Sequence, residues 1–301
     1  MVAISKYDQA NNNEVDALIA LLTVTDIGDD RFTGGIKPDG IGRVFGGQVI
    51  AQALMAAQNC VADERVAHSL HAYFMRPGAE GCETRYQVAR DYDGGSFSNR
   101  RVVARQNDKI ILSMTASFHR AEPGLSHRSV MPEVPMPEAL RSDAEIRDEL
   151  RDRIPERFRE FFTRPRPLES RPVEQRNWLV GEKSAPNQNT WFRLAKPIGD
   201  DAAMHRAILA YATDMSLLST GTLPHGLSWL HNNVFSTSLD HAIWFHEPCR
   251  VDEWLLYACQ SPWTGGGRSM NFGSIFTRDG RLVASTAQEG LMREIKPADS
   301  A

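Results

Sequence analysis

The sequence predicts an α+β protein built from two tandem copies of one unit, each with an antiparallel sheet wrapped around a central helix. Two observations predict this fold. One is an internal repeat at a nearly constant offset, and the other is a helical segment in each copy, followed by β-rich runs with turns between them. Strands joined by short turns favour antiparallel pairing, and the apolar face of the helix then packs on the sheet. A chain of 301 residues has room for two domains of ordinary size.

Three features of the repeat occur in the same order in both copies. Residues 68–78 (HSLHAYFMRPG) resemble residues 238–248 (SLDHAIWFHEP) at an offset of 170 (241 − 71). The other two matches are the glycine pairs at 94–95 and 266–267, offset by 172 (266 − 94), and the segments 106–115 and 277–286, offset by 171 (277 − 106). An ordered series with so little drift indicates a duplicated unit.

The first copy gives the order of elements. A short strand at residues 30–34 precedes a helix that begins near Gly46-Gly47. Five apolar residues of this helix recur on one face: Val49, Ile50, Ala53, Leu54 and Ala57. Strands are then expected at residues 67–75, 84–90, 99–106 and 109–119. Asn107-Asp108 predicts the hairpin turn between the last two.

The second copy repeats this order, with a strand at residues 168–175, a helical segment at 205–218 and a hairpin turn at Asp279-Gly280. Between the copies, residues 121–165 are rich in Pro, Arg and Glu, and residues 138–162 have helical spacing with heavy charge. We expect a surface linker that carries a helix. The predicted domains are therefore residues 1–120, 121–165 and 166–295.

The composition excludes several classes of protein. A net charge of −4 argues against nucleic acid or an anionic membrane as partner. The four cysteines form no C-x-x-C pair and lie far from zinc-finger histidine spacing, so we expect free thiols and no metal. The first residues lack a signal-peptide pattern, no apolar run approaches the ~20 residues of a membrane span, and the last residues are not a peroxisomal signal. A cytoplasmic enzyme is the expectation.

Several catalytic and cofactor-binding motifs are missing from the sequence. Residues 226–230 (GLSWL) lack the closing glycine of a nucleophile elbow, there is no P-loop, and residues 265–270 (GGGRSM) lack the last glycine of a dinucleotide site. We therefore expect no cofactor. The histidine pairs 68/71 and 241/246 have odd separations in predicted strands, so the members of each pair face opposite sides and do not form a metal site. A carboxylate that activates water remains.

Asp214 is the carboxylate that local reasoning selects. It lies in the helical segment 205–218, and its neighbours on the same face are apolar or aromatic: Ala207, Ala210, Tyr211, Leu217 and Leu218. Burial without a partner costs several kcal/mol or raises the pKa of a carboxyl group. Two interpretations fit this placement: an active-site carboxylate, or a helix cap or core carboxylate satisfied by backbone N–H groups.

Four motifs together resemble one known family. They are residues 43–49 (RVFGGQV), 68–78 (HSLHAYFMRPG), 239–246 (LDHAIWFH) and 283–290 (VASTAQEG). They are similar to the acyl-CoA thioesterase II family, which includes bacterial thioesterase II and the peroxisomal acyl-CoA thioesterases. The resemblance runs from about residue 14 to residue 293 and implies a double hot-dog fold.

The resemblance also implies a catalytic set. The family uses an aspartate on the second hot-dog helix, a threonine or serine that opens the following strand, and a glutamine in the last strand. These match Asp214, Ser238 and Gln288. Bacterial thioesterase II has threonine where this chain has Ser238; the hydroxyl is kept, but the rotamer restriction of a β-branched side chain is lost.

The expected reaction is hydrolysis of fatty acyl-CoA by direct attack of water. Asp214 would accept the proton, while Ser238 and Gln288 orient the water. Two alternatives stay open: a hot-dog enoyl-CoA hydratase or dehydratase, which usually needs an Asp/His pair around the central helix, and a protein that binds acyl-CoA without turning it over. No histidine follows Asp214 within two helical turns, which argues against the first.

Other residues have open roles. The backbone of Gly46-Gly47 could supply oxyanion donors or only allow close helix–sheet packing. His68 matches the position of Ser238 in the first copy (238 − 170), so it either lines the same groove or is an ordinary strand histidine. Arg43, Arg76 and Arg100 could meet CoA phosphates or be solvated or ion-paired. Because hot-dog sheets commonly pair, the resemblance also leads us to expect a homo-oligomer.

Overall fold

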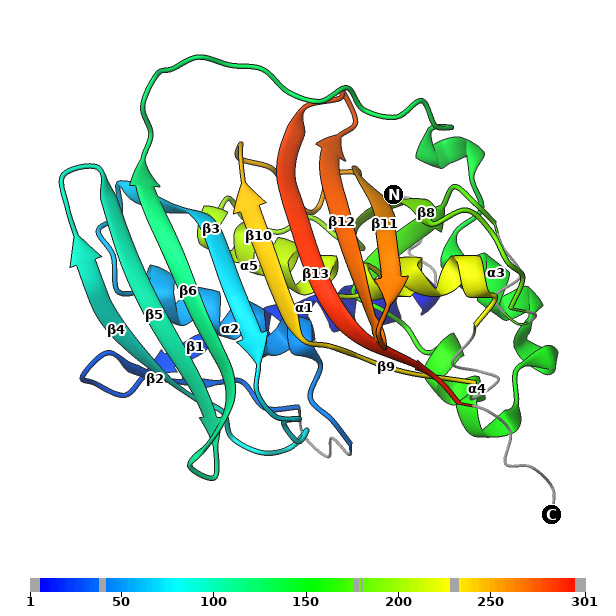
Figure 1. Cartoon of the computed structure of the whole chain (residues 1–301), viewed down its shortest axis with the longest axis horizontal. Helices are drawn as coiled ribbons and strands as arrows, with labels where there is room; N and C mark the ends of the chain where they lie inside the picture. Colours follow the sequence, from blue (N-terminus) through cyan, green and yellow to red (C-terminus); the bar gives the residue numbers. More distant parts are fainter. Residues whose placement is uncertain (1–5, 38–41, 176–178, 180, 228–232, 296–301) are drawn as a thin grey trace.

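The computed structural model describes residues 6–37, 42–175, 179, 181–227 and 233–295. Thirteen described strands form one antiparallel sheet, in the order β1-β2-β4-β5-β6-β3-β10-β13-β12-β11-β8-β7, with β9 paired to β13. The strands of the first copy thus make one side of the sheet and those of the second make the other. The two sides join where β3 pairs with β10 (Figure 1).

The strands of the first side are β1 (Val24–Asp26), β2 (Arg31–Gly34), β3 (Arg65–Phe74), β4 (Arg85–Asp93), β5 (Phe97–Gln106) and β6 (Lys109–Arg120). Those of the second are β7 (Leu168–Pro172), β8 (Asn187–Leu194), β9 (Val234–Ser238), β10 (Asp240–Phe245), β11 (Leu255–Gly265), β12 (Arg268–Thr277) and β13 (Leu282–Glu294). The predicted hairpin turns at Asn107-Asp108 and Asp279-Gly280 join β5 to β6 and β12 to β13.

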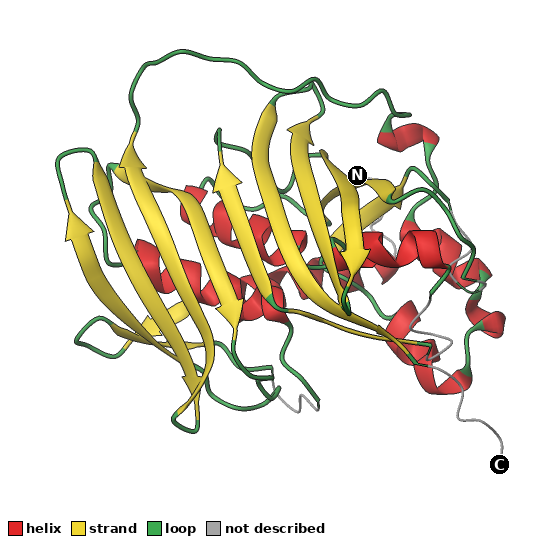
Figure 2. Ribbon diagram, viewed as in Figure 1, coloured by secondary structure: helices red, strands yellow, loops and turns green. Residues whose placement is uncertain are grey.

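Two helices lie against one face of the sheet, α2 (Gly46–Gln58) from the first copy and α5 (Ala202–Thr213) from the second (Figure 2). The sequence predicted one buried face for α2, but every residue from Gly47 to Ala57 is buried. Helix α1 (Lys6–Leu22), which was not predicted, also packs against α2. A helix covered on all sides must satisfy its polar groups internally. Gln52 does so by accepting a hydrogen bond from the Tyr86 hydroxyl at 2.6 Å.

The linker differs from the single helix expected at residues 138–162. It has two short helices, α3 (Asp143–Glu149) and α4 (Glu156–Thr163), and two 3-10 turns, η1 (Pro137–Ala139) and η2 (Arg151–Arg153). Pro155 separates the two helices, because proline disfavours the helical conformation in the residue before it. Residues 121–130 are exposed throughout.

The next part of the linker covers the outer face of the second side of the sheet. Met131, Val134 and Leu140 pack against a small buried cluster of Trp191, Trp254, Leu256 and Phe276. The indole N–H of Trp191 donates to the Pro135 carbonyl at 2.9 Å. The linker is therefore partly a structural cover. The domain limits 1–120, 121–165 and 166–295 stay a prediction.

The repeat offset can be refined from strand registers. Ala104 pairs with Leu112 in the first copy, and Ile275 pairs with Ala284 in the second. Both pairs are buried, so the offset is 171 from β5 to β12 (275 − 104) and 172 from β6 to β13 (284 − 112). An offset of 172 makes Ala116 the structural equivalent of Gln288.

Candidate active site

Asp214 is the C-terminal cap of helix α5. Its φ and ψ of −81° and −7° are still helical, and its side chain is only 4% exposed. The helix therefore stops earlier than the predicted segment 205–218. The 3-10 turn η3 (Leu218–His225) follows and closes at Gly226, whose φ of 65° suits glycine.

The start of helix α2 meets this carboxylate. The backbone N–H of Gly47 donates to Asp214, and a Cβ atom built on Gly46 would lie 2.8 Å from Asp214 Oδ2. Burial is the largest effect on the carboxyl group and raises its pKa to about 6. Hydrogen bonds from Gln288, Gly47 and Ser238 act in the opposite direction, because they stabilise the ionised form. Asp214 is thus a buried carboxylate with a pKa near the working range of a general base.

Ser238 lies at a break between two strands. It is the last residue of β9, and β10 begins two residues later. At the break, the N–H of Leu239 donates to the Glu289 carbonyl (2.9 Å), and the N–H of Glu289 donates to the Asp240 carboxylate (2.6 Å). Ser238 therefore closes a strand instead of opening one as predicted, and the side-chain hydrogen bond replaces a missing ladder bond.

Gln288 joins the other two predicted residues. Its Nε2 lies 2.6 Å from Asp214 Oδ1 and 3.0 Å from Ser238 Oγ, while Ser238 Oγ lies 3.5 Å from Asp214 Oδ1. The side chain of Gln288 is fully buried in the middle of β13. Its Oε1 is buried and accepts no hydrogen bond from the residues that the structure describes. The three residues selected from the sequence thus form one contiguous cluster.

His241 belongs to the same cluster but was not selected from the sequence. Its Nδ1 lies 3.1 Å from Gln288 Nε2, and its Nε2 lies 3.0 Å from the Thr213 hydroxyl. Complete burial lowers the pKa of the imidazole to about 3, so the ring is neutral at physiological pH. Its partner in the sequence pair, His246, is half-exposed and contacts Ser285 Oγ, in keeping with the expected opposite faces.

The other predicted residues are not part of the cluster. His68 Nε2 contacts Ser117 Oγ at 2.8 Å, and its ring lies against Phe97 and His119, which supports the reading of an ordinary strand histidine. Arg100 is 2% exposed and donates to the Asp93 carboxylate and to backbone carbonyls, including that of Cys60. It is therefore a buried structural arginine that cannot meet a phosphate.

Two further arginines are the remaining candidates for binding the phosphates of CoA. Arg76 donates to the Ile110 carbonyl at 3.0 Å, and Arg43 is exposed and forms an isolated antiparallel bridge with Ala79. None of the helices among the described residues is long and apolar enough to cross a bilayer. All four cysteines are free thiols.

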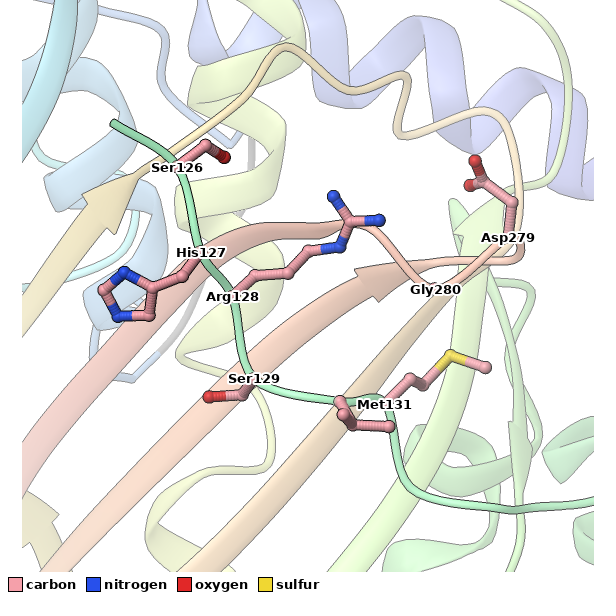
Figure 3. Close-up of a pocket in the computed structure, with 8 residues that line it drawn as sticks. Ser126, His127, Arg128, Ser129, Met131, Asp279 and Gly280 are labelled. Carbon is pink, nitrogen blue, oxygen red and sulfur yellow. The ribbon is translucent and has the colours of Figure 1, made fainter. Parts of the chain in front are cut away.

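A surface cavity lies away from this cluster. It forms where residues 126–131 of the linker pass over Asp279 and Gly280 of the β12–β13 turn (Figure 3). Asp214, Ser238, His241 and Gln288 are not among its lining residues. We assign no role to it.

Known proteins share both sequence and fold with this chain. The acyl-CoA thioesterase family matches residues 158–291, and the family of acyl-CoA thioesterase N-terminal domains matches residues 37–119. Human acyl-coenzyme A thioesterase 8 is 39% identical over 92% of this chain and 88% of its own length. Acyl-CoA thioesterase 2 of Haemophilus influenzae is 37% identical over 92% of this chain and 96% of its own.

Solved structures agree. The acyl-CoA thioesterase II TesB2 of Mycobacterium marinum has a TM-score of 0.75 at 36% identity and covers 93% of this chain and 99% of its own. A hot-dog protein of unknown function from Alicyclobacillus acidocaldarius has a TM-score of 0.73 at 18% identity, with 94% and 99% covered, and supports the fold alone. The architecture is a double hot-dog, as the resemblance implied. The chain belongs to the acyl-CoA thioesterase family and is thus an acyl-CoA thioester hydrolase.

Proposed function

We propose that this protein hydrolyses fatty acyl-CoA to a free fatty acid and CoA at the cluster of Asp214, Ser238 and Gln288. The observation that carries the proposal is the contact of all three side chains around one buried carboxylate oxygen, Asp214 Oδ1. A water molecule beside this group meets a base, a hydroxyl and an amide at once. Such preorganisation is what direct hydrolysis requires.

In the proposed reaction, Asp214 removes a proton from water as the water oxygen attacks the thioester carbonyl. The tetrahedral intermediate collapses by breaking the C–S bond, and the proton held by Asp214 returns to the products. The leaving thiolate is a weak base, with a cysteine-like pKa near ~8.5, so it needs little acid assistance. A positioned base of this kind contributes about 10²–10⁴-fold to the rate.

The Gln288 amide has two parts in this proposal. One N–H of its Nε2 donates to Asp214, which stabilises the ionised carboxylate, and Ser238 Oγ lies 3.0 Å from the same nitrogen. Its Oε1 has no donor among the described residues, so it is available to accept a hydrogen bond from the attacking water. Gly47 N–H is already engaged by Asp214, so of the two glycines only Gly46 could offer its N–H to the oxyanion.

His241 bears on the hydratase alternative, since it supplies a histidine near Asp214. Its Nδ1 is 4.0 Å from Asp214 Oδ1. However, the ring is fully buried, both of its nitrogens are occupied by Gln288 and Thr213, and its pKa is lowered to about 3. A general acid or base must reach the reacting group, so this histidine does not make the pair that a hydratase needs.

The proposal is tested by thiol release from acyl-CoA substrates of several chain lengths, with wild type and Asp214→Asn. We expect Asp214→Asn to lower kcat by about 10²-fold or more and to keep the wild-type circular dichroism spectrum. Wild-type turnover by a folded Asp214→Asn protein would refute the role of this carboxylate. Binding of acyl-CoA by wild type without thiol release would favour the non-catalytic alternative. The cytoplasmic location and a homo-oligomer stay predictions.

A further inference from the structure

A continuous chain of hydrogen bonds leads from the backbone of helix α5 to the Gln288 amide. The Thr213 hydroxyl lies 3.1 Å from the Ala210 carbonyl and 3.0 Å from His241 Nε2. On the other side of the ring, His241 Nδ1 lies 3.1 Å from Gln288 Nε2. The side chains of Thr213, His241 and Gln288 are all fully buried.

The direction of this chain is fixed at one end by chemistry. The Ala210 carbonyl can only accept, so the Thr213 hydroxyl donates to it. The hydroxyl oxygen then accepts from His241 Nε2–H, and a neutral imidazole with its proton on Nε2 presents Nδ1 as an acceptor. The remaining donor is the Gln288 amide, which gives one N–H to Nδ1.

The contacts of Gln288 with Asp214 predict the same donor and acceptor roles along this chain. If the Gln288 amide were rotated by half a turn, Oε1 would take the place of Nε2, 2.6 Å from the Asp214 carboxylate and 3.1 Å from the Nδ1 lone pair. Two acceptors in contact with the amide oxygen repel it, and buried unpaired groups cost about 1–3 kcal/mol each. Only one orientation of the amide satisfies both His241 and Asp214.

The first copy of the unit lacks this arrangement. Ala116 is the structural equivalent of Gln288, and Leu70, which pairs with Ala116, is buried on the inner face. Asn59 is the C-terminal cap of helix α2, whereas Asp214 is the C-terminal cap of helix α5. The first copy therefore lacks the carboxylate, the amide and the imidazole together. This joint absence links His241 to the chemistry of the second copy and not to the fold that both copies share.

We propose that His241, held in its Nε2–H form by Thr213, is a positioning residue that fixes the orientation of the Gln288 amide toward Asp214 and Ser238. This inference rests on the proposed function, because the amide matters only if the cluster holds the reacting water. Both ring nitrogens of His241 are occupied by Thr213 and Gln288, so it acts on the site through the amide. Partners that orient the ligands of a metal site typically contribute about 10–100-fold to activity, and we expect an effect of similar size here.

Two substitutions at position 241 separate this role from simple packing. In His241→Asn, the amide oxygen can take the place of Nδ1 and accept from Gln288. In His241→Gln, the amide reaches the place of Nε2 next to Thr213 and leaves Gln288 without its acceptor. We expect kcat for His241→Gln to fall about tenfold or more below that of His241→Asn, with a similar KM for both. A packing role would predict the reverse order, since glutamine fills more of the imidazole volume.

The matched control is His246, which directly follows the same strand, is half-exposed and is bonded to Ser285. His246→Asn and His246→Gln should both keep wild-type kcat and KM. Equal losses in the two His241 variants, or a larger loss in His241→Asn, would overturn the proposal. Asp214→Asn is measured in parallel, since its inactivity together with equal His241 variants would remove the positioning role and leave the proposed function intact.

A measurement on the unmodified side chain gives a test that does not depend on the His241 variants. With ¹⁵N-labelled histidine, NMR should show one ring that keeps Nε2–H and an unprotonated Nδ1 down to about pH 5, as expected for a buried neutral imidazole. It is assigned by its shift change in Asp214→Asn. An Nδ1–H ring, or a ring that becomes protonated near pH 6, would contradict the inferred chain.

Discussion

Asp214 is ionised at neutral pH only at an electrostatic cost. Its pKa is raised to about 6, so the carboxylate that serves as the proposed base is lost as pH falls through this value. We expect kcat/KM to be constant above about pH 7 and to fall tenfold per pH unit below about pH 5. His241 is neutral over this pH range, so it should add no second inflection to the pH profile of kcat/KM. A thiol-release assay across pH measures the profile, and full activity at pH 5 would contradict the assignment.

The same burial predicts that Asp214 lowers the stability of the fold. The pKa of Asp214 is about 6 in the folded state and 3.8 in the unfolded state, so the folded state binds the proton more tightly. The free energy of unfolding therefore falls as pH rises from 3.8 to about 6, where the unfolded state loses its proton first. The difference, 6 − 3.8, is about two units, or about 3 kcal/mol at most. Asp214→Asn should therefore have a higher Tm than wild type at pH 8, and the gain should shrink toward pH 4. An equal gain at both pH values would mean that the carboxylate charge is not responsible.

The sequence alone predicted the site residues to different degrees. Asp214 could be selected from its apolar neighbours, whereas Ser238 and Gln288 were selected by family resemblance. His241 was missed because the repeat matches it with His71, which is exposed, while the strand registers match it with Leu70, which is buried. A slip of one residue moves a side chain to the other face of a strand. The alternation of inward-facing positions on neighbouring strands would have placed His241 on the inner face, beside Gln288.

At the scale of elements, the approach of α2 to the end of α5 is what places the carboxylate. Gly46 leaves room for it, since an added Cβ would lie 2.8 Å from Asp214 Oδ2 and 2.8 Å from Phe74 Cζ. We expect Gly46→Ala to displace the carboxylate and lower kcat by about tenfold or more, given how steeply rate depends on the geometry of a base. The readouts are kcat and Tm.

Gly95 provides the control for this substitution. A Cβ added there would meet no atom within 4 Å, and its φ lies outside the left-handed region. Gly95→Ala should therefore leave kcat unchanged. Wild-type kcat in Gly46→Ala would show that the site tolerates a shift of the helix start.

The order of elements could be predicted better than their limits. The strands of the first copy and both hairpin turns follow from alternation and turn residues, which are local signals. Pro155, which separates α3 from α4, is also a local signal. Helix α1 and the cover formed by residues 131–140 could not be predicted in this way. Contacts with distant elements decide them: α1 packs on α2, and residues 131–140 pack on the cluster around Trp191. Tertiary contacts of this kind override local propensity.

At the scale of the whole molecule, the join between β3 and β10 makes the two copies one cooperative unit. Leu70 of β3 pairs with Ile243 of β10, and both are fully buried in a core that spans both copies. Leu70→Ala should destabilise the protein by about 2–5 kcal/mol. All six tryptophans lie at or beyond residue 178, in the second copy. Their fluorescence should nevertheless shift to a lower Tm when Leu70, in the first copy, is truncated.

Val66 supplies the comparison, because it lies on the same strand but is 40% exposed. Val66→Ala should change the tryptophan transition by less than about 1 kcal/mol. In Leu70→Ala, circular dichroism could instead show an early transition while the tryptophan transition stays at the wild-type temperature. That result would mean that the two copies unfold independently.

The exposed segment of residues 121–130 has a further consequence for the integrity of the enzyme. It is the direct covalent tie between the two copies, yet it contributes no atom to the cluster around Asp214, to the β3–β10 join or to the cover over Trp191. A nick in this segment severs the polypeptide but leaves the non-covalent interface whole. The two fragments would then stay associated as a non-covalent complex. Activity would depend on this association and not on an intact chain.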